Sequence, residues 1–272
     1  MFQDTADRLR NRPGPIEAAP ARQPSHAGAS TTFRRLLARI HRHYYTVTET
    51  ARVGPLAFPF TRIADPNRVL DQVVAEEDRL EKVRGRRLPE DQLHLPYWAE
   101  LWDSALGIGQ WLTANTTRSS SPLSVLDLGC GMGLTGTVAA AIGHDVLFAD
   151  LEPPALLFAR LNSLPWRRRV RTRRLDWRAD ALGEEFDLIL GADILYERRQ
   201  WDYLEPFWQQ HLAPGGAVLL GEPGRQTGEL FLPWVLQRGW KLQELEEPVE
   251  TRTKPIRILR LTRDEDAAGR AG

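Results

Sequence analysis

Residues 125–136 read VLDLGCGMGLTG, an apolar run that ends in a carboxylate and passes into closely spaced glycines. The apolar run is typical of a strand buried on both faces, and the glycines let the backbone turn sharply toward a following helix. Further strand-like runs follow at 145–150, 170–176, 186–193 and 216–222, with helical patterns between them. Strand and helix in alternation predict an α/β fold, a doubly wound, mostly parallel, Rossmann-like sheet.

The C-terminal part of the chain departs from this alternation. Two strand-like segments, 240–246 and 255–262, follow one another with no helical pattern between them. Consecutive strands joined by a short connection pair antiparallel, so these two are expected to form a hairpin that brings the sheet to seven strands.

The chain divides into four parts by composition. Residues 1–32 are rich in Pro, Ala, Arg and Ser without apolar periodicity, which predicts a disordered tail. Residues 33–94 form an N-terminal addition, residues 95–264 form the α/β domain, and residues 265–272 form a second disordered tail. Additions of this kind often shape a substrate entrance.

Within the addition, three elements are expected. Apolar residues at helical spacing predict a short amphipathic helix over 33–42, and alternating residues over 44–63, broken at Val53-Gly54-Pro55, predict a hairpin or two extended segments. A helix is predicted to start at Pro66. Its apolar face is expected to contain Val69, Leu70, Val73 and Val74.

Composition limits the classes of partner. The chain carries 36 basic and 36 acidic residues, so no net charge draws it to nucleic acid or an anionic membrane. Cys130 is the one cysteine, which excludes an internal disulfide and fits a reducing compartment. No apolar run is long enough for a membrane span, and the start of the chain lacks a secretory signal. We therefore expect a cytoplasmic protein without a metal site.

The glycine loop alone does not decide between two cofactors. Gly131, Gly133 and Gly136 satisfy the GxGxxG pattern of dinucleotide sites, and Gly129 precedes them. Asp127 separates the two hypotheses, because a carboxylate there would repel a pyrophosphate and attract the ammonium group of a methionine moiety. The charge favours S-adenosylmethionine over NAD. Cys130 sits inside this loop, at a position that needs only its backbone.

Two further strand ends complete the predicted cofactor site. Asp150, followed by Leu151, ends the second strand, where a carboxylate can accept hydrogen bonds from both ribose hydroxyls. After the third strand, Trp177 offers an indole face for the adenine and Asp176 a carboxylate for its exocyclic amine. The alternative for Trp177 is ordinary packing in the core.

Beyond the loop, four segments carry a resemblance to a known family. They are LPYWAELWDSALGIGQWL (95–112), LDW (175–177), GADILY (191–196) and GEPGR (221–225). In these the chain resembles the seven-strand, class I S-adenosylmethionine methyltransferases, and within them the protein-lysine methyltransferases, most closely those acting on the electron-transfer flavoprotein beta subunit. Glu222 is a departure, since many relatives have Asp there.

The resemblance implies a protein-lysine N-methyltransferase that uses S-adenosylmethionine. It implies that the cofactor is lined by Trp102, Gly129 to Gly131, Asp150, Trp177 and Ala192, and that Asp193 and Tyr196 face the acceptor as catalytic residues.

The chemistry of the residues agrees with such an acceptor site. Methyl transfer from a sulfonium needs alignment, exclusion of water and a neutral nucleophile. An aromatic pocket of Tyr97, Trp98, Trp102 and Tyr196 would hold a lysine ammonium by cation–π attraction, and Asp193 would orient it or accept a proton.

Simpler interpretations stay open. Asp193 could cap a helix, and Trp98 and Trp102 could be a core-packing pair on one helix face. The acceptor could be a small-molecule amine or carboxylate. The six arginines in 166–174 could contact phosphates, although a solvated sheet edge is the commoner reason for such a segment, and the fold could also serve as a binding module without transfer activity.

Overall fold

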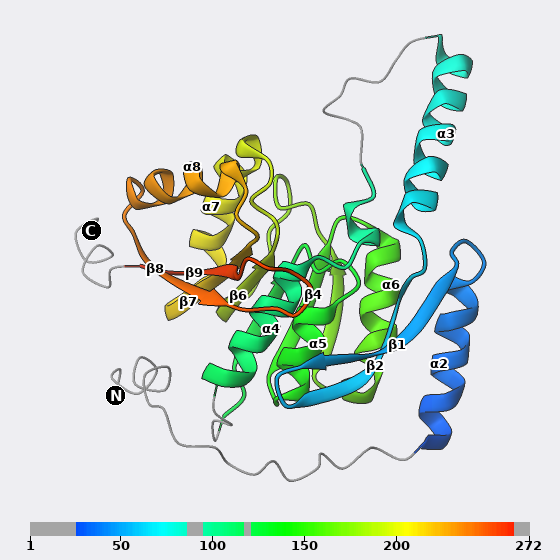
Figure 1. Cartoon of the computed structure of the whole chain (residues 1–272), viewed down its shortest axis with the longest axis horizontal. Helices are drawn as coiled ribbons and strands as arrows, with labels where there is room; N and C mark the ends of the chain where they lie inside the picture. The colour runs from blue at the N-terminus through cyan, green and yellow to red at the C-terminus, as the bar shows by residue number, and fades with distance from the viewer. Residues whose placement is uncertain (1–25, 86–94, 117–120, 264–272) are drawn as a thin grey trace.

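The computed structural model describes residues 26–85, 95–116 and 121–263 of the chain. Its main feature is a seven-stranded sheet in the order β5-β4-β3-β6-β7-β9-β8 (Figure 1). The strands are β3 (Ser124–Leu128), β4 (Asp145–Asp150), β5 (Val170–Arg174), β6 (Phe186–Ala192), β7 (Leu212–Glu222), β8 (Trp240–Glu247) and β9 (Ile256–Arg263). Strands β3 to β7 are parallel to their neighbours in that group, while β9 runs antiparallel to both β7 and β8. The predicted fold class is confirmed.

The order of the strands creates a crevice at the centre of the sheet. From β3 the chain moves outward through β4 to β5, and then returns to place β6 on the other side of β3. Connections that leave two adjacent strands in opposite directions open a crevice outside their carboxyl ends, where ligands of such folds bind. The glycine loop after β3 and the Asp193 segment after β6 both lie at this edge.

Helices cover the two faces of the sheet and bury two separate apolar clusters. One face packs against α4 (Asp103–Asn115), α5 (Leu134–Ala141) and α6 (Pro153–Asn162). The opposite face packs against α7 (Trp201–His211) and α8 (Gln226–Leu236). The apolar strands β3, β4 and β6 contribute to both clusters, as expected of parallel strands with two buried faces.

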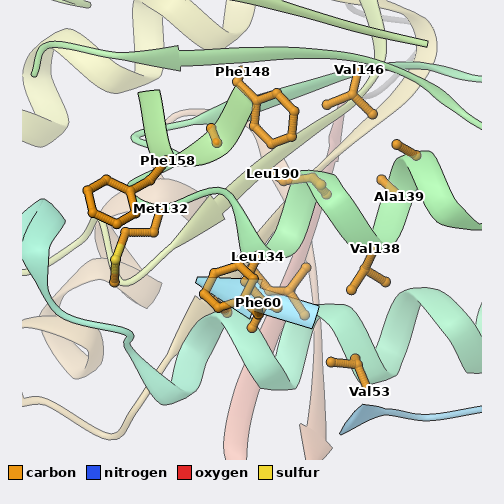
Figure 2. Packing of buried hydrophobic residues seen from close by; sticks show 14 of the residues in the cluster. Val53, Phe60, Met132, Leu134, Val138, Ala139, Val146, Phe148, Phe158 and Leu190 are labelled. Atoms are coloured by element: carbon orange, nitrogen blue, oxygen red, sulfur yellow. The ribbon is translucent and has the colours of Figure 1, made fainter. Parts of the chain in front are cut away.

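The N-terminal addition packs against the first of these faces. It consists of α2 (His26–Ile40), the antiparallel pair β1 (Thr46–Val53) and β2 (Leu56–Ile63), and α3 (Pro66–Arg84). Gly54 turns the hairpin with a φ of 54°. Figure 2 shows Val53 and Phe60 from the hairpin beside Leu134 and Val138. The addition and the α/β domain therefore share one hydrophobic core.

A buried amide links the addition to the glycine loop. Asn162 lies at the end of α6 and is almost fully buried. Its Oδ1 accepts a hydrogen bond from the Thr61 amide at 2.8 Å, and its Nδ2 donates to the Thr61 and Met132 carbonyls, each at 2.9 Å. The Ile63 amide also donates to the Met132 sulfur at 3.4 Å. The hairpin thus bonds directly to Met132 of the glycine loop.

Replacing Asn162 with alanine is expected to lower the free energy of unfolding by about 2–4 kcal/mol, because it leaves buried backbone groups without partners. Chemical denaturation would measure this change. Asn67→Ala, at an exposed position on the first turn of α3, is the matched control. A loss below about 0.5 kcal/mol for Asn162→Ala would contradict a structural role for this amide.

Several sequence predictions need adjustment at their edges. The first helix begins at His26, inside the segment expected to be a disordered tail, and β7 begins at Leu212 rather than at Gly216. Strand β5 ends at Arg174 instead of Asp176, and the final strand ends at Arg263. Residues 1–25 and 264–272 lie outside the described residues, so the tails stay predictions.

The apolar face predicted for the helix at Pro66 is buried only at its start. Val69 is the only residue of α3 that is buried, whereas Leu70 and Val74 are exposed. Figure 1 shows the reason, since α3 extends away from the other described elements beyond its first turn. Asp65 caps the helix start and accepts from the Asn67 amide at 3.0 Å, so local signals place it correctly.

Candidate active site

A pocket of about 670 Å³ opens at the carboxyl ends of the central strands. Its volume lies in the range of cofactor and small-ligand sites. It is lined by every site residue predicted from the sequence except Asp127. Those lining residues are Tyr97, Trp98, Trp102, Gly129, Cys130, Gly131, Gly133, Asp150, Leu151, Asp176, Trp177, Ala192, Asp193 and Tyr196. The fold therefore gathers in one place residues that are spread over 100 positions of sequence.

The glycine loop has a backbone conformation that other residues rarely adopt. The φ angles of Gly129, Gly131 and Gly133 are 64°, 51° and 83°. A Cβ atom on Gly133 would lie 2.7 Å from the Cα of Ala159, so α6 packs directly against the bare loop. The loop is thus shaped by both torsion and packing, which fits a site where backbone approaches a ligand.

Asp127 lies beneath this loop and not in the pocket lining. It is fully buried, and its Oδ2 accepts a hydrogen bond from the Gly136 amide at 2.8 Å, in the first turn of α5. This bond joins the strand end to the helix that follows the loop. The predicted contact with a methionine ammonium stays a prediction, and the geometry gives Asp127 the additional role of holding the loop's far end.

Asp150 bonds to the glycine loop and also lines the pocket. Its Oδ2 accepts from the Gly131 amide at 2.8 Å, and its Oδ1 accepts from the Glu152 amide at 2.9 Å. A carboxylate oxygen has two lone-pair sites, so each oxygen keeps capacity for a ligand hydroxyl. The residue therefore fixes the glycine loop and still presents both oxygens to the pocket.

Burial raises the pKa of both carboxyl groups. The pKa of Asp127 rises to about 7 and that of Asp150 to about 6, chiefly through desolvation. Backbone hydrogen bonds oppose the rise, from Gly136 to Asp127 and from Glu152 and Gly131 to Asp150. The folded protein thus holds protons that the unfolded chain releases near a pKa of 3.8. Stability of the ligand-free protein should fall as the pH rises from about 4 to about 7.

The same shift predicts pH-dependent cofactor binding. Ionised Asp150 accepts ribose hydroxyl bonds better than its protonated form does, so affinity should rise with pH and level off above about 7. We expect the Kd of S-adenosylhomocysteine to fall about fourfold between pH 5.5 and 7.5, with proton release on binding. Titration calorimetry in two buffers of different ionisation enthalpy measures both quantities. A Kd that does not change over this range would contradict the assignment.

The Trp177 indole lines part of the pocket. The edge of the Trp177 indole lies against Gly129, and its Nε1 donates to Oε1 of Gln200 at 3.0 Å. Both oxygens of Asp176 already accept from the Arg178 guanidinium, so a bond from Asp176 to an adenine amine would use a remaining lone pair. Gln200 was not predicted from the sequence, because no local pattern marks a partner 23 residues beyond Trp177.

Three further aromatic rings line the pocket. The rings of Tyr97 and Tyr196 lie 5.1 Å apart, and the Trp102 ring lies 6.4 Å from that of Tyr97. The Trp102 indole donates to the Tyr97 carbonyl at 2.9 Å. Tyr97 and Tyr196 are partly exposed, so these two rings are reachable from solvent.

Trp98 belongs mainly to the core. It is 8% exposed, and its ring contacts Tyr44 at 5.3 Å and Phe158 at 5.9 Å. The interpretation of Trp98 and Trp102 as a pair on one helix face is wrong, because a short turn ends at Ala99 and α4 begins only at Asp103. Trp98 therefore reaches the pocket through its edge and backbone.

Asp193 occupies an unusual backbone position. It is the one non-glycine residue with a positive φ, 57°, among the described residues. Its side chain is buried, and both carboxylate oxygens accept from the Arg225 guanidinium, at 3.0 Å from Nε and 2.7 Å from Nη2. The interpretation of Asp193 as a helix cap is wrong, because the next helical turn starts at Arg198 behind Glu197. Strained residues held by a network are typical of functional sites.

Tyr196 is not suited to accept a proton. Desolvation, followed by the charges of Glu197 and other nearby groups, raises the pKa of its phenol to about 12. The hydroxyl stays neutral near pH 7, so Tyr196 can shape the pocket and form hydrogen bonds.

Among the described residues, no group of three or more His, Cys, Asp or Glu side chains is arranged to hold a metal ion.

Comparison with known proteins decides the family. A family model described as lysine methyltransferase matches residues 89–232, more than half of the chain. The chain belongs to this family. The family predicted from the four sequence segments is therefore confirmed.

Curated relatives of this lysine methyltransferase family member agree with the match. A protein N-lysine methyltransferase of Xenopus tropicalis, METTL21A, is 35% identical over 142 residues, which are 49% of this chain and 63% of that protein. An electron transfer flavoprotein beta subunit lysine methyltransferase of Danio rerio is 32% identical over 140 residues, 49% of this chain and 52% of that protein. The chain thus spans less than two thirds of the length of these relatives.

A solved structure of low sequence identity shares the fold. The glycopeptide N-methyltransferase MtfA, complexed with S-adenosylhomocysteine, superposes with a TM-score of 0.51 at 14% identity, covering 60% of this chain and 91% of that one. At this identity the likeness concerns the arrangement of the sheet and helices alone.

The arginine-rich segment forms an edge of the sheet. Strand β5 is an outer strand, and four of the six arginines bond within the protein. Those four are Arg169 to Asp145, Arg171 to Glu184, Arg173 to the Ala181 carbonyl and Arg174 to the Leu151 carbonyl. This geometry favours the solvated edge over a phosphate-binding surface.

In the described part of the chain, no helix combines the length and apolarity needed to cross a bilayer.

Proposed function

We propose that this family member transfers a methyl group from S-adenosylmethionine to the side-chain amine of a lysine in a protein. The observation that carries the proposal is a single pocket lined by the glycine loop and Asp150, which form its proposed cofactor end, and by Tyr97, Tyr196 and Asp193, which form its proposed acceptor end. A cofactor and an acceptor amine in that pocket would meet. The cytoplasm stays the expected location from sequence alone.

The residues of the cofactor end suit S-adenosylmethionine. Asp150 would accept the ribose hydroxyls, Trp177 would cover the adenine, and the bare backbone of Gly129 and Gly131 would let the methionine part approach. When bound, this cofactor supplies an electrophilic methyl group on a sulfonium. Residues 129–133 of the glycine loop include no basic side chain, which agrees with a cationic ligand rather than a pyrophosphate.

The residues of the acceptor end suit an amine. Tyr97 and Tyr196 offer ring faces that attract an ammonium, and the Asp193 carboxylate lies in the same pocket. The reaction requires the amine lone pair to form the new N–C bond as the C–S bond breaks, so the proton must leave first. Desolvation by the rings lowers the pKa of a lysine ammonium and so favours loss of its proton.

The small-molecule alternative is tested in the same experiment as the protein substrate. The purified chain is incubated with tritium-labelled S-adenosylmethionine and clarified cell lysate, with Asp150→Ala protein as the control for endogenous enzymes. Label in a protein band that releases methyllysine on hydrolysis supports the proposal. Label confined to the low-mass fraction would favour a small-molecule acceptor, and label in neither would contradict the activity.

A further inference from the structure

An arginine beside the Trp102 ring is bonded to the predicted catalytic carboxylate. Arg225 lies in the GEPGR segment directly before α8, 32 residues beyond Asp193. Its guanidinium binds both Asp193 oxygens side by side, the arrangement in which an arginine and a carboxylate interact most strongly. The carboxylate side chain is 5% exposed, whereas the arginine side chain is 40% exposed. The pair therefore lies at the boundary between the buried site and solvent.

Arg225 is itself held by neighbours on two other elements. Its backbone amide donates to Oε1 of Glu222 at the end of β7, and Glu222 also accepts from the Gly224 amide and the Arg257 guanidinium. The Arg225 guanidinium carbon lies 5.5 Å from the centre of the Trp102 ring. Glu222 on β7 thus fixes the Arg225 backbone, and Trp102 before α4 lies beside its guanidinium.

The charge balance at the pocket matters for an amine acceptor. A lone carboxylate beside a lysine stabilises the ammonium form and raises the pKa of the amine. An ammonium has no lone pair with which to attack a methyl group. Asp193 can orient the acceptor without keeping it protonated only if another positive charge offsets the carboxylate.

We propose that Arg225 is a positioning residue that fixes the Asp193 carboxylate and offsets its charge, so that a lysine amine bound there loses its proton near neutral pH. The inference rests on the proposed function and deepens it. It assigns to the pair an arrangement in which Asp193 accepts a hydrogen bond from the amine and the proton leaves to solvent.

Other titratable groups also lie near Arg225 and Tyr196. Asp193, Glu222 and Tyr97 act on Arg225, while Glu197, Tyr97, Asp150 and Asp193 act on Tyr196. Tyr196 stays neutral, and Arg257 is bonded to Glu222 and Glu229. Among these groups, Arg225 is the cation in direct contact with Asp193.

The test is the pH dependence of the initial rate with lysate protein as acceptor and saturating labelled S-adenosylmethionine. For Arg225→Gln, the rising limb of the profile should move to higher pH by about one unit, with roughly tenfold lower rate at pH 7. The Kd of S-adenosylhomocysteine should stay within about twofold of the wild type. The control is Arg171→Gln. Arg171 lies on β5 and binds both oxygens of Glu184, and neither residue lines the pocket. This variant should leave the pH profile unchanged.

Arg225→Lys separates charge from geometry. Lysine keeps the positive charge but cannot bind both carboxylate oxygens in the same fork, so the rate should fall while the rising limb stays within about 0.3 units of the wild type. This variant also carries the test if Arg225→Gln does not fold. A limb that moves as far in Arg225→Lys as in Arg225→Gln would overturn the inference.

An Arg225→Gln profile that is uniformly lower but not displaced would also overturn it, because a purely structural arginine gives that result. The outcome differs from failure of the proposed function, in which the wild-type chain labels no protein at any pH and both proposals fall.

Discussion

Replacing Asp193 with asparagine is expected to lower the rate of methyl transfer by about a hundredfold or more, with the Kd of S-adenosylhomocysteine changed by no more than about threefold. Asparagine is chosen because it tolerates the left-handed backbone conformation at this position and is close in shape to aspartate. The charge that orients the acceptor is lost, while the cofactor end of the pocket is untouched. Initial rates with labelled cofactor and calorimetry measure the two quantities.

The matched control is Asp202→Asn on α7, an exposed carboxylate that is also paired with arginines, Arg198 and Arg238. It should change neither rate nor affinity. An Asp193→Asn protein that binds the cofactor and retains more than about half of its rate would refute a catalytic role for Asp193. Parallel loss of cofactor affinity would mean that the division of the pocket into two ends is wrong.

Replacing Asp150 with alanine is expected to weaken S-adenosylhomocysteine binding by at least about a hundredfold. The variant loses hydrogen bonds between a charged oxygen and two ribose hydroxyls, each worth about 1.5–3 kcal/mol. It also removes the acceptor that fixes the Gly131 amide, so the loop itself loses a constraint. Calorimetry at pH 7.5, where the wild-type carboxylate is ionised, gives the largest difference.

Asp145→Ala is the control for this second variant, because Asp145 begins the same strand β4 and lies at the opposite edge of the sheet. Its side chain is exposed and forms an ion pair with Arg169. Its loss should leave affinity unchanged. If Asp150→Ala bound the cofactor within about fivefold of the wild type, the ribose assignment would not stand.

Local sequence patterns were sufficient for most of the fold. The strands 124–128 and 145–150 were predicted at their observed bounds, because a buried apolar run with a glycine or acidic end leaves few alternatives. The helix start at Pro66 followed from the preference of proline for the first helical position. Burial of that helix could not be read in the same way, since an apolar stripe shows which face could be covered but not whether another layer lies beside it.

The site divides along the same line. Asp150 and Trp177 were predicted from the sequence because they lie at or just after the ends of strands, and strand ends of a parallel sheet meet at one edge. Asp193 and Tyr196 came from the family resemblance of the GADILY segment. The position of Asp127 beneath the loop depended on the packing of α5, which the glycine pattern does not specify.

The sequence by itself determined that VLDLGCGMGLTG ends a central strand in a glycine loop, because the torsions and packing required there exclude larger residues. Only the tertiary structure decided which side chains meet around that loop. Gln200 reached Trp177, Asn162 reached the N-terminal hairpin, and Arg225 reached Asp193. Each of these bonds joins residues from separate elements, and their contact depends on strand order and helix packing that no local pattern encodes.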